Sequence, residues 1–548
     1  MRITFIFVSI LSLLTIFILS FWKAEVWVSL LIVAPLIAIG CYDMLQTKHS
    51  LRRNFPLIGR GRWFMEFVRP FIRQYFIESD IDGAPVNRMF RSLIYQRAKS
   101  NLDTNPYGTK VDTYRQGYEW FAHSMTAFHI KDEECEPRIL IGESNCKKPY
   151  NASVLNISAM SFGALSNNAV RALNKGAKMG GFAHNTGEGS VSPFHLENNG
   201  DLIWQIGTGY FGCRTEMGLF CEEAFAKTVA HDNIKMAEIK LSQGAKPGHG
   251  GILPAAKNSP TIAKIRGVQP YTTVDSPPAH SAFSTPIEMM HFIQKLREIS
   301  GGKPIGFKLC VGRPSEFIAL CKAMIKTGIR PDFITVDGAE GGTGAAPLEF
   351  SNSVGMPLRD GLRLVCDVLT GYDLKKDIKV IAVGKVFSGF HIARLLSIGA
   401  DLCYSARGMM MALGCVQSLI CNTNECPTGV ATQNENLIKG LVVADKSQRV
   451  ANFHKETVKA FMQIVSAAGL TDTKQINRTH VFRRVDQMCI KRYDELFPYL
   501  TPGCLSSEPY PEYLERDKKE ASADSFCPVH CIASHDKGSE IGLAVVNE

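Results

Sequence analysis

The sequence of 548 residues lacks several features that mark common functional classes. Its Lys and Arg residues form no dense stripe, and its net charge is a modest +9, so we expect no nucleic-acid partner. No G-x-G-x-x-G fingerprint opens a strand–helix–strand unit, which argues against a dinucleotide-binding domain of that type. No internal repeat or low-complexity segment stands out, so a repeat architecture is not expected.

Sixteen cysteines in so long a chain indicate reduced thiols and metal ligands rather than a disulfide framework. A cytosolic catalytic domain is therefore expected. A short C-x3-C motif near the end, Cys527 to Cys531 with His530 between, could bind a metal ion but is isolated.

The first fifty residues contain two apolar runs, Ile3 to Trp22 and Val26 to Cys41, separated by three residues. Each approaches the length that a membrane helix requires, and a signal peptide would not be followed at once by a second run. Basic residues gather after the second run: Lys48, Arg52, Arg53, Arg60, Arg62, Arg69 and Arg73. The positive-inside rule predicts a two-helix membrane protein with its catalytic domain in the cytoplasm.

Beyond the apolar runs, we predict a membrane-proximal region at 45–130, a catalytic domain at 131–480 and a tail at 481–548, after two membrane helices within 1–44. The arginines of the membrane-proximal region could bind anionic lipid or pair with carboxylates, or serve packing and solubility alone.

Short β-branched runs alternate with amphipathic stretches through the catalytic domain. The predicted strands are 153–158, 203–208, 234–240, 305–311, 332–337, 378–383 and 401–404. The predicted helices include 166–178, 286–299, 314–328, 357–370 and 387–398. Repeated strand–helix units imply a parallel sheet, and this number favours an α/β fold of the (β/α)8 TIM-barrel type. Its active site is then expected at the carboxyl ends of the strands.

Three cysteines, Cys415, Cys421 and Cys426, lie within twelve residues that Asn, Pro and Gly interrupt. Thiolates bind iron–sulfur clusters and zinc, and three thiols without a nearby histidine suit a three-iron cluster better than tetrahedral zinc. Three ordinary buried cysteines remain an alternative.

Glycine-rich turns and isolated lysines mark other strand ends. Lys246 lies in the loop KLSQGAKPGHGGILP, where a cation could bind a substrate carboxylate or a flavin oxygen. Lys308 lies in an otherwise apolar strand and needs an anion, such as the N1–O2 edge of a flavin. Two turns after consecutive strands favour phosphate binding, through Gly341, Gly342, Thr343 and Gly344 and through Gly384 and Lys385.

The cysteine run, with its sequence CNTNECPTGVATQ, and the loop QGAKPGHGG resemble the synthase domain of the glutamate synthase large subunit, over roughly residues 150–475. The resemblance implies FMN and a 3Fe-4S cluster held by Cys415, Cys421 and Cys426. It implies that the segment AMSFGALS, with Met160 and Ser161, backs the flavin. It also implies contacts to 2-oxoglutarate from Gln243, Lys246, Arg266 and Ser284, with Lys246 and Glu188 as catalytic residues near the substrate.

The sequence departs from this family in three ways. Ile252 stands where the family has a glutamine, which removes a polar contact and puts the substrate in question. No glutaminase region precedes the barrel, and no dinucleotide fingerprint is present. The expected function is reduction of the imine of 2-oxoglutarate to glutamate, with ammonia from solution or a partner and electrons from a donor protein or reductase. A related flavin enzyme for another keto or imino acid, or a non-catalytic membrane-attached scaffold, are the alternatives.

Overall fold

The computed structural model describes residues 1–128 and 136–529. The chain divides into two units, Met1–Met89 and Phe90–Glu548. Residues His530 and Cys531 of the C-terminal cysteine motif lie outside the described residues.

The N-terminal unit begins with two apolar helices in the predicted places. Helix α1 spans Arg2–Ser20, and a short 3-10 turn at Ala24–Ser29 leads into α2 at Leu30–Leu45. Both segments are long and apolar enough to cross a membrane, and very little of either is buried in protein. Two further helices follow, α3 (Ser50–Asn54) and α4 (Arg60–Ile72), and a π-helical turn, η2, continues α4 over Arg73–Ile77.

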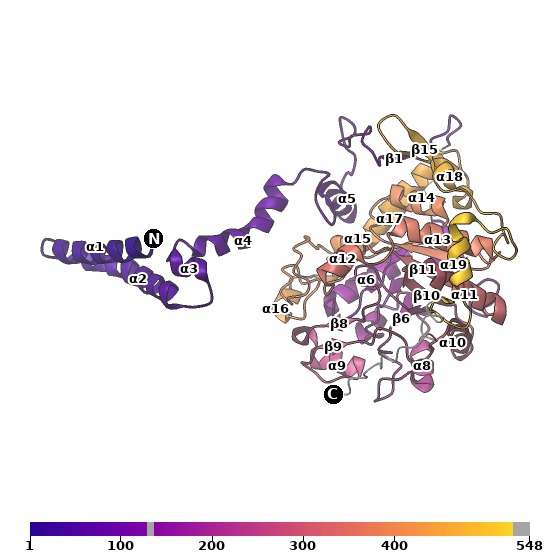
Figure 1. Cartoon of the computed structure of the whole chain (residues 1–548), viewed down its shortest axis with the longest axis horizontal. Helices are drawn as coiled ribbons and strands as arrows, with labels where there is room; N and C mark the ends of the chain where they lie inside the picture. The colour runs from indigo at the N-terminus through magenta and orange to yellow at the C-terminus, as the bar shows by residue number, and fades with distance from the viewer. Residues whose placement is uncertain (129–135, 530–548) are drawn as a thin grey trace. The chain divides into compact units, whose positions relative to one another are not determined.

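The second unit is built on a closed barrel of eight parallel strands, which confirms the predicted fold (Figure 1). Around the barrel the order is β10-β11-β12-β13-β4-β5-β6-β7. The strands are β4 (Leu155–Ile157), β5 (His184–Asn185), β6 (Leu202–Ile206), β7 (Ile234–Lys240), β10 (Ile305–Cys310), β11 (Phe333–Asp337), β12 (Lys379–Val383) and β13 (Leu402–Ser405). Every predicted strand segment overlaps one of them. The eighth strand, β5, has two residues, too few for an alternating pattern to reveal it.

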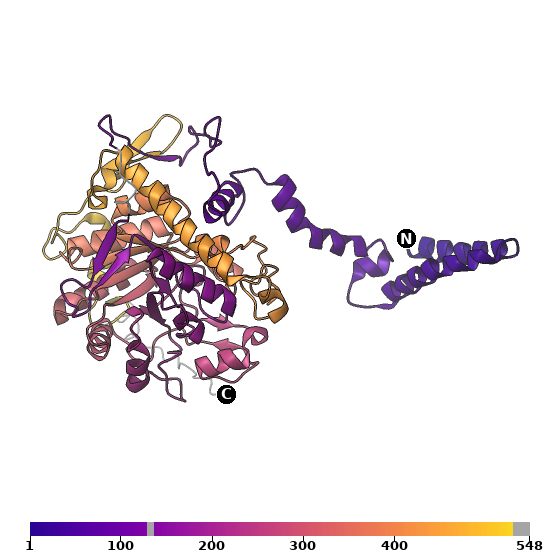
Figure 2. The same cartoon turned by 180° about the vertical axis from the view of Figure 1, so that it is seen from behind.

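Helices follow the barrel strands and cover them. They are α6 (Asn167–Gly180), α7 (Pro193–Leu196), α8 (Glu222–Val229), α10 (Pro286–Ile299), α11 (Pro314–Thr327), α13 (Leu358–Gly371), α14 (Gly389–Ile398) and α17 (Val443–Ala467). The longest, α17, lies along α6, as the orange and purple helices of Figure 2 show. Ser166 and Thr285 cap α6 and α10 through their hydroxyls, which explains where these helices begin.

Shorter elements complete this unit. They are α5 (Arg88–Ala98), β1 (Glu119–Phe121), β2 (Arg138–Ile141), β3 (Tyr150–Ser153), β8 (Ile252–Leu253), η4 (Ala255–Lys257), α9 (Pro260–Arg266), β9 (Val274–Asp275), α12 (Leu348–Ser353), α15 (Arg407–Ala412), α16 (Glu435–Ile438), η5 (Thr473–Gln475), η6 (Arg478–His480), β14 (Val481–Arg484), β15 (Ile490–Arg492), α18 (Tyr493–Leu496) and α19 (Glu512–Glu520).

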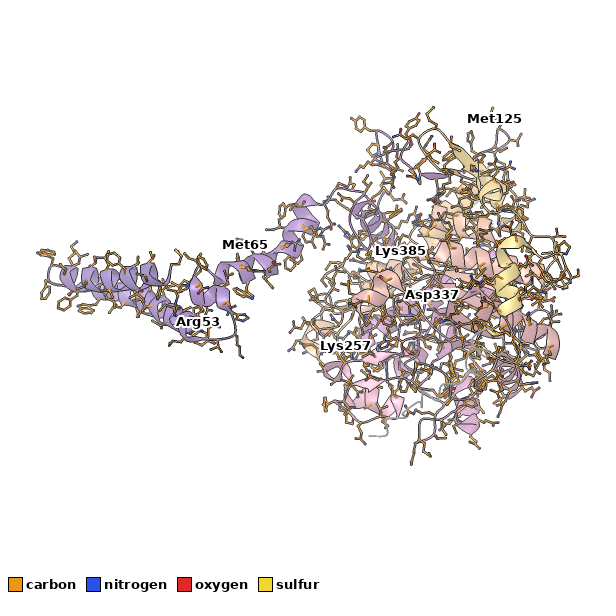
Figure 3. All side chains as sticks on the ribbon, viewed as in Figure 1. Arg53, Met65, Met125, Lys257, Asp337 and Lys385 are labelled. Atoms are coloured by element: carbon orange, nitrogen blue, oxygen red, sulfur yellow. The ribbon has the colours of Figure 1, made fainter. Side chains whose placement is uncertain are left out.

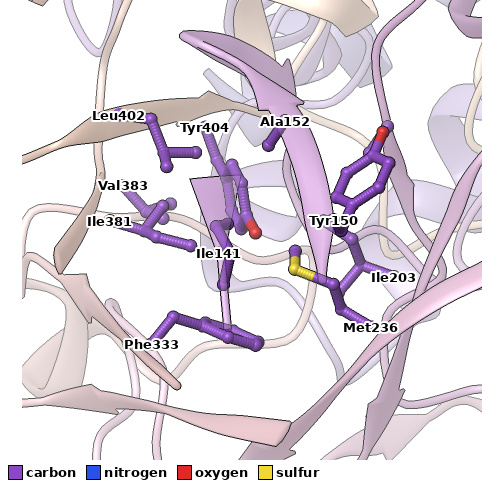
Figure 4. Packing of buried hydrophobic residues seen from close by; sticks show 11 residues of the cluster. Ile141, Tyr150, Ala152, Ile203, Met236, Phe333, Ile381, Val383, Leu402 and Tyr404 are labelled. Atoms are coloured by element: carbon purple, nitrogen blue, oxygen red, sulfur yellow. The ribbon is translucent and has the colours of Figure 1, made fainter. Parts of the chain in front are cut away.

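A cluster of buried apolar residues joins the hairpin of β2 and β3 to the barrel strands. The hairpin of β2 and β3 contributes Ile141 and Tyr150 to a buried cluster (Figure 4). They meet Ile203 near the start of β6, Phe333 at the start of β11 and Leu402 at the start of β13. Some strands end in buried polar groups, such as Lys240 of β7 and Asp337 of β11.

Candidate active site

The barrel interior changes from apolar to charged along each of two strands. Because strand side chains alternate with a period of two, Met236, Glu238 and Lys240 of β7 face the same way. Met236 belongs to the apolar cluster, whereas Lys240 ends the strand as a buried cation. On β11 the same progression runs from Phe333 in the cluster to Asp337 at the strand's end. The charged groups therefore converge at the carboxyl ends, where barrel enzymes carry their active sites.

Glu188 is the centre of a cluster of three cations. It lies in the loop after β5, and Lys240 Nζ forms an ion pair with its Oε1 at 2.9 Å. Burial alone would raise the pKa of Glu188, but Lys240, Arg266 and Lys246 together lower it. The loops after β5 and β6 approach closely, since a Cβ on Gly207 would lie 2.7 Å from the Glu188 carboxylate. The sequence predicted Glu188, Lys246 and Arg266 near the substrate, and the fold brings these three together.

Lys246 and Arg266 are both buried, with 1% and 5% of their surfaces exposed. Lys246 Nζ donates to the carbonyl of Gly250 at 2.8 Å, and Arg266 Nη2 donates to the carbonyl of Phe162 at 3.1 Å. Burial lowers the pKa of Lys246, and it lowers that of Arg266 to about 10, while Glu188 opposes both shifts. The buried Nε of Arg266 has no hydrogen-bond partner among the described residues, so a donor remains free for an anion.

The other predicted substrate contacts lie in different surroundings. Gln243 is half-buried in the loop after β7. Ser284 lies just before α10, where its hydroxyl donates to Glu288 Oε2 at 2.9 Å and so takes part in the cap of that helix. Ile252 is half-buried in β8 and pairs with Asp275 of β9.

Lys308 has a partner that the sequence analysis did not single out. Its Nζ lies 2.9 Å from Oδ2 of Asp337 across neighbouring strands, and both side chains are buried. Burial would lower the pKa of Lys308, but Asp337 and Glu238 raise it above its usual value. The protein therefore supplies Lys308 with an anion of its own, at the level of the strand ends.

Glu238 lies one layer below Lys308 and Asp337 in the barrel, where it is fully buried and hydrogen-bonded. Its carboxylate accepts hydrogen bonds from Asn185 at 2.9 Å, Gln205 at 2.6 Å and Thr335 at 2.6 Å. These partners lie on β5, β6 and β11, so the contacts cross the barrel interior. A carboxylate with three such donors fixes the strands beneath the site.

The segment predicted to back a flavin follows β4. Met160 is buried and Ser161 is half-buried, and the carbonyl of the next residue, Phe162, is the acceptor for Arg266. This segment and the cation cluster are therefore in direct contact.

The two predicted phosphate turns meet an arginine that the sequence analysis missed. The turn with Gly341, Gly342, Thr343 and Gly344 follows β11, and a Cβ on Gly342 would clash with the guanidinium of Arg407. The second turn contains Gly384 and Lys385, the latter with a φ of +51°, and leads to the N-cap Ser388 of α14. Burial and the charge of Arg407 lower the pKa of Lys385. Two cations and a helix N-terminus here make a site suited to a phosphate.

Cys415, Cys421 and Cys426 lie near one another. Burial and the neighbouring thiols of Cys421 and Cys426 raise the pKa of Cys415 to about 11. A Cβ on Gly344 would lie 3.4 Å from the Cβ of Cys421, so the first phosphate turn borders the cysteine loop. Among the described residues, no three Cys, His, Asp or Glu side chains converge on a single metal position. A three-iron cluster needs no such convergence, because each thiolate binds a different iron.

Lysine 257 is a further residue that the sequence analysis missed (Figure 3). It ends η4, and its Nζ donates to carbonyls that include that of Cys421 at 2.7 Å. A pattern search could not single it out, because its role depends on loops distant in the sequence. The sequence could have indicated Arg407, since this residue comes shortly after a predicted strand.

Comparisons with known proteins show the family to which this chain belongs. A family model described as a conserved region in glutamate synthase matches residues 88–471. The chain is 37% identical over 496 residues to the glutamate synthase large subunit-like protein YerD of Bacillus subtilis, covering 83% of this chain and 93% of that protein. It is 31% identical over 321 residues to the archaeal glutamate synthase (NADPH) of Methanocaldococcus jannaschii. This similarity covers 58% of this chain and 60% of that protein, so the chain spans less than two thirds of that relative's length.

Among solved structures, the chain is similar to a lactate oxidase of Pediococcus acidilactici, with a TM-score of 0.43 and 13% identity. That similarity covers 76% of this chain and 93% of the other.

Proposed function

We propose that this chain reduces the imine of 2-oxoglutarate to glutamate at the carboxyl ends of its barrel strands. The chain belongs to the glutamate synthase family and is an oxidoreductase of the glutamate synthase type. The observation that carries this proposal is the cluster of Lys246, Arg266 and Lys240 around Glu188. A five-carbon dicarboxylate needs two cationic contacts, and Lys246 and Arg266 supply them from adjoining segments. The unpartnered Nε of Arg266 is a ready donor for a carboxylate oxygen.

FMN is the flavin that this site fits. Met160 and Ser161 would lie behind its ring, Lys308 would face its N1–O2 edge, and the turns at 341–344 and 384–385 with Arg407 would hold its phosphate. The glycine at 342 supports this, because no side chain fits there beside Arg407. Bound FMN would supply the hydride that reduces the imine, which forms from 2-oxoglutarate and ammonia.

The chain's own residues orient the substrate and manage its charge. Arg266 and Lys246 bind and orient the carboxylates, and Glu188 balances their charge when the site has no anion. Lys246, with its pKa lowered by burial, is suited to give a proton at the reacting carbon–nitrogen group. Gln243 is a further polar contact from the same loop. Ser284 would serve the substrate only by giving up its bond to Glu288.

Cys415, Cys421 and Cys426 are the proposed ligands of a 3Fe-4S cluster. The mutual influence of their thiols and the contact of Cys421 with the first phosphate turn support this assignment. A bound cluster would carry electrons to the flavin from a donor protein or reductase.

We also propose that α1 and the segment Ala24–Leu45 cross a membrane, with the barrel on the cytoplasmic side. The support is their length and apolarity and the basic residues that follow them. The domain limits at residues 44, 130 and 480 remain predictions.

Purified full-length protein tests the proposal directly. We expect a flavin and iron–sulfur absorbance spectrum, and ammonia-dependent glutamate formation from 2-oxoglutarate with an artificial reductant. Acid-released flavin should run as FMN on chromatography. If 2-oxoglutarate and ammonia neither reoxidise the reduced flavin nor perturb its spectrum, the substrate assignment is wrong.

The presence of Ile252 favours a second candidate function, which is the reduction of a different keto or imino acid by the same chemistry. An apolar side chain at this position forms no hydrogen bond with the substrate, and one hydrogen bond to a charged group contributes about 1.5–3 kcal/mol. A turnover screen over keto acids with ammonia separates the two. A non-catalytic scaffold would be colourless and inactive in both assays.

A further inference from the structure

Helix α4 has two chemically distinct faces. Phe64, Phe67 and Phe71 recur at intervals of three and four residues, so they share one face. Their side chains are 60%, 71% and 50% exposed, and α4 buries none of its residues. Arg62 and Arg69, seven residues apart, lie on the opposite face. Three exposed aromatic side chains in one stripe are an unfavourable arrangement in water.

The acidic partners of α4 and of the turn that follows it leave several arginines exposed: Arg73 lies 4.0 Å from Glu78, yet its side chain remains largely exposed. Residues 60–73 contain four arginines and a single acidic residue, Glu66. Arg69 approaches Glu66 only to 3.9 Å, and both side chains are largely exposed. Arg60 differs, because it pairs at 2.8 Å with Asp43, a fully buried residue near the end of α2. This pair fixes the start of α4 beside the end of the second apolar helix.

We propose that α4 is an interfacial helix that binds the surface of an anionic lipid bilayer. Its phenylalanine face would lie at the boundary of the acyl chains, and Arg62, Arg69 and Arg73 would face the lipid phosphates. Charge complementarity and continuity with the apolar helices favour a bilayer over a second protein. The inference rests on the proposed membrane insertion of α1 and α2.

Hydrogen–deuterium exchange of the full chain tests this in nanodiscs of phosphatidylcholine with or without phosphatidylserine. We expect amides of 60–73 to exchange at least several-fold more slowly in the anionic discs, with α10 as an internal control that does not change. Phe67→Glu should abolish the protection. Replacing Arg62, Arg69 and Arg73 by Gln should remove its dependence on lipid charge.

Equal exchange in both lipids, unaffected by Phe67→Glu, would overturn the proposal. Protection that depends on protein concentration instead of lipid would assign the face to a second copy of the chain, and would also overturn it. Alkaline carbonate extraction reports insertion of α1 and α2 separately. If the chain is extracted, flotation with anionic and neutral vesicles decides whether α4 binds lipid without them.

A separate observation concerns Lys257, which is 3% exposed. Its Nζ donates to three carbonyls, those of Ala164 at 3.2 Å, Cys421 at 2.7 Å and Ala431 at 2.9 Å. Ala164 lies in the loop after β4, whereas Cys421 and Ala431 lie in the cysteine loop. One ammonium group therefore ties together the proposed flavin and cluster loops.

No carboxylate forms an ion pair with Lys257 within the described ranges 1–128 and 136–529. The shortest of its three hydrogen bonds, at 2.7 Å, goes to the carbonyl of Cys421, a proposed cluster ligand. A buried ammonium without a counter-charge is costly, whereas three thiolates and a cluster would supply negative charge beside it.

We infer that Lys257 is a positioning residue that holds the Cys421 loop and provides the positive counter-charge of the cluster. The inference rests on the proposed cluster. A positive charge close to an iron–sulfur cluster stabilises its reduced form, so Lys257 should raise the reduction potential.

Redox titration of the full-length protein, followed by electron paramagnetic resonance, tests the role of Lys257. We expect Lys257→Met to shift the cluster's midpoint potential to a more negative value and Lys257→Arg to restore most of it. Lys264→Met is the matched control, because Lys264 is an exposed lysine on α9 and its loss should leave the potential unchanged.

An unchanged potential in Lys257→Met with full iron content would refute the counter-charge role while leaving the cluster in place. Iron-free wild-type protein would instead refute the cluster, and the inference with it. If Lys257→Met does not retain iron, Lys257→Gln and Lys257→Arg decide between the two roles: a wild-type potential in the neutral Gln variant would contradict the inference.

Discussion

The two units of the chain place the same kinds of residue in opposite surroundings. In the N-terminal unit, Phe7 and Phe17 are more than half exposed, whereas Phe307 and Phe333 of the barrel are completely buried. Charges show the reverse pattern. Glu66 and Arg69 of α4 lie in solvent, while Lys308 and Asp337 are buried at the strand ends.

This contrast separates two physical roles. Exposed apolar surface is unfavourable in water, so it supports the proposal that this part of the chain contacts lipid. Buried charge is costly and persists only where it is paired, so it indicates where the chain binds an anion or performs chemistry. Charge substitutions should therefore have large effects in the barrel and small ones in the N-terminal unit.

The largest effect on activity is expected for Arg266→Ala. It should lower turnover of 2-oxoglutarate by roughly a hundredfold, because it removes a charged contact to the substrate, and it should leave FMN bound. The matched substitution Arg62→Ala in α4 should change turnover less than about twofold. Steady-state kinetics and flavin content measure both. Similar losses in the two variants would erase the contrast between the units.

Glu188→Gln should destabilise the barrel by about 3–5 kcal/mol, because it leaves Lys240, Lys246 and Arg266 without their counter-charge. Glu66→Gln, the same change on an exposed helix, should cost less than about 0.5 kcal/mol. Urea unfolding in detergent, followed by flavin fluorescence, gives both values. A stable Glu188→Gln protein would mean that the cations do not depend on this carboxylate.

The contribution of Glu188 should depend on pH in a defined direction. Its pKa in the folded protein lies below the usual value of 4.5. Its ion pair therefore stabilises the fold fully above pH 4.5 and loses this effect as the pH falls through the lowered pKa. The free energies of unfolding of the wild type and of Glu188→Gln should become more similar as the pH falls below 4.5. A difference that stays constant from pH 6 to pH 3 would contradict the pairing.

The smallest effect is expected for Arg69→Gln. Its partner Glu66 is 3.9 Å away and both side chains are exposed, so the unfolding free energy should change by less than about 0.5 kcal/mol. The same urea measurement in detergent checks this value, since detergent contains no anionic lipid. A loss above about 1 kcal/mol would show that α4 contacts the protein more tightly than its exposure indicates.

Much of the barrel could be predicted from the sequence because its signals are local. The strand segments and helices α6, α10, α11, α13 and α14 follow from hydrophobic periodicity and agree with the structure to within a few residues. The strand β5 was missed because two residues carry no periodicity. Site residues in glycine-rich loops, such as Lys246, stood out because charged side chains are uncommon there.

Other site residues became evident only in the folded chain. Lys240 and Asp337 look like ordinary strand termini in the sequence, and Lys257 looks like a surface lysine. Each acquires its partner from another strand or loop: Lys308 for Asp337, Glu188 for Lys240 and Cys421 for Lys257. Such pairs form when the barrel closes, and no local pattern encodes them.

The sequence by itself determined the order of strands and helices, the two apolar N-terminal segments, the cysteine spacing and the glycine turns. These depend on side-chain periodicity and backbone preference, which act over a few residues. Only the tertiary structure decided that Glu188 balances three cations, that Lys308 pairs with Asp337 and that Arg407 faces Gly342. Those contacts join the carboxyl ends of different strands, and closure of the sheet into a barrel is the physical event that brings them within reach.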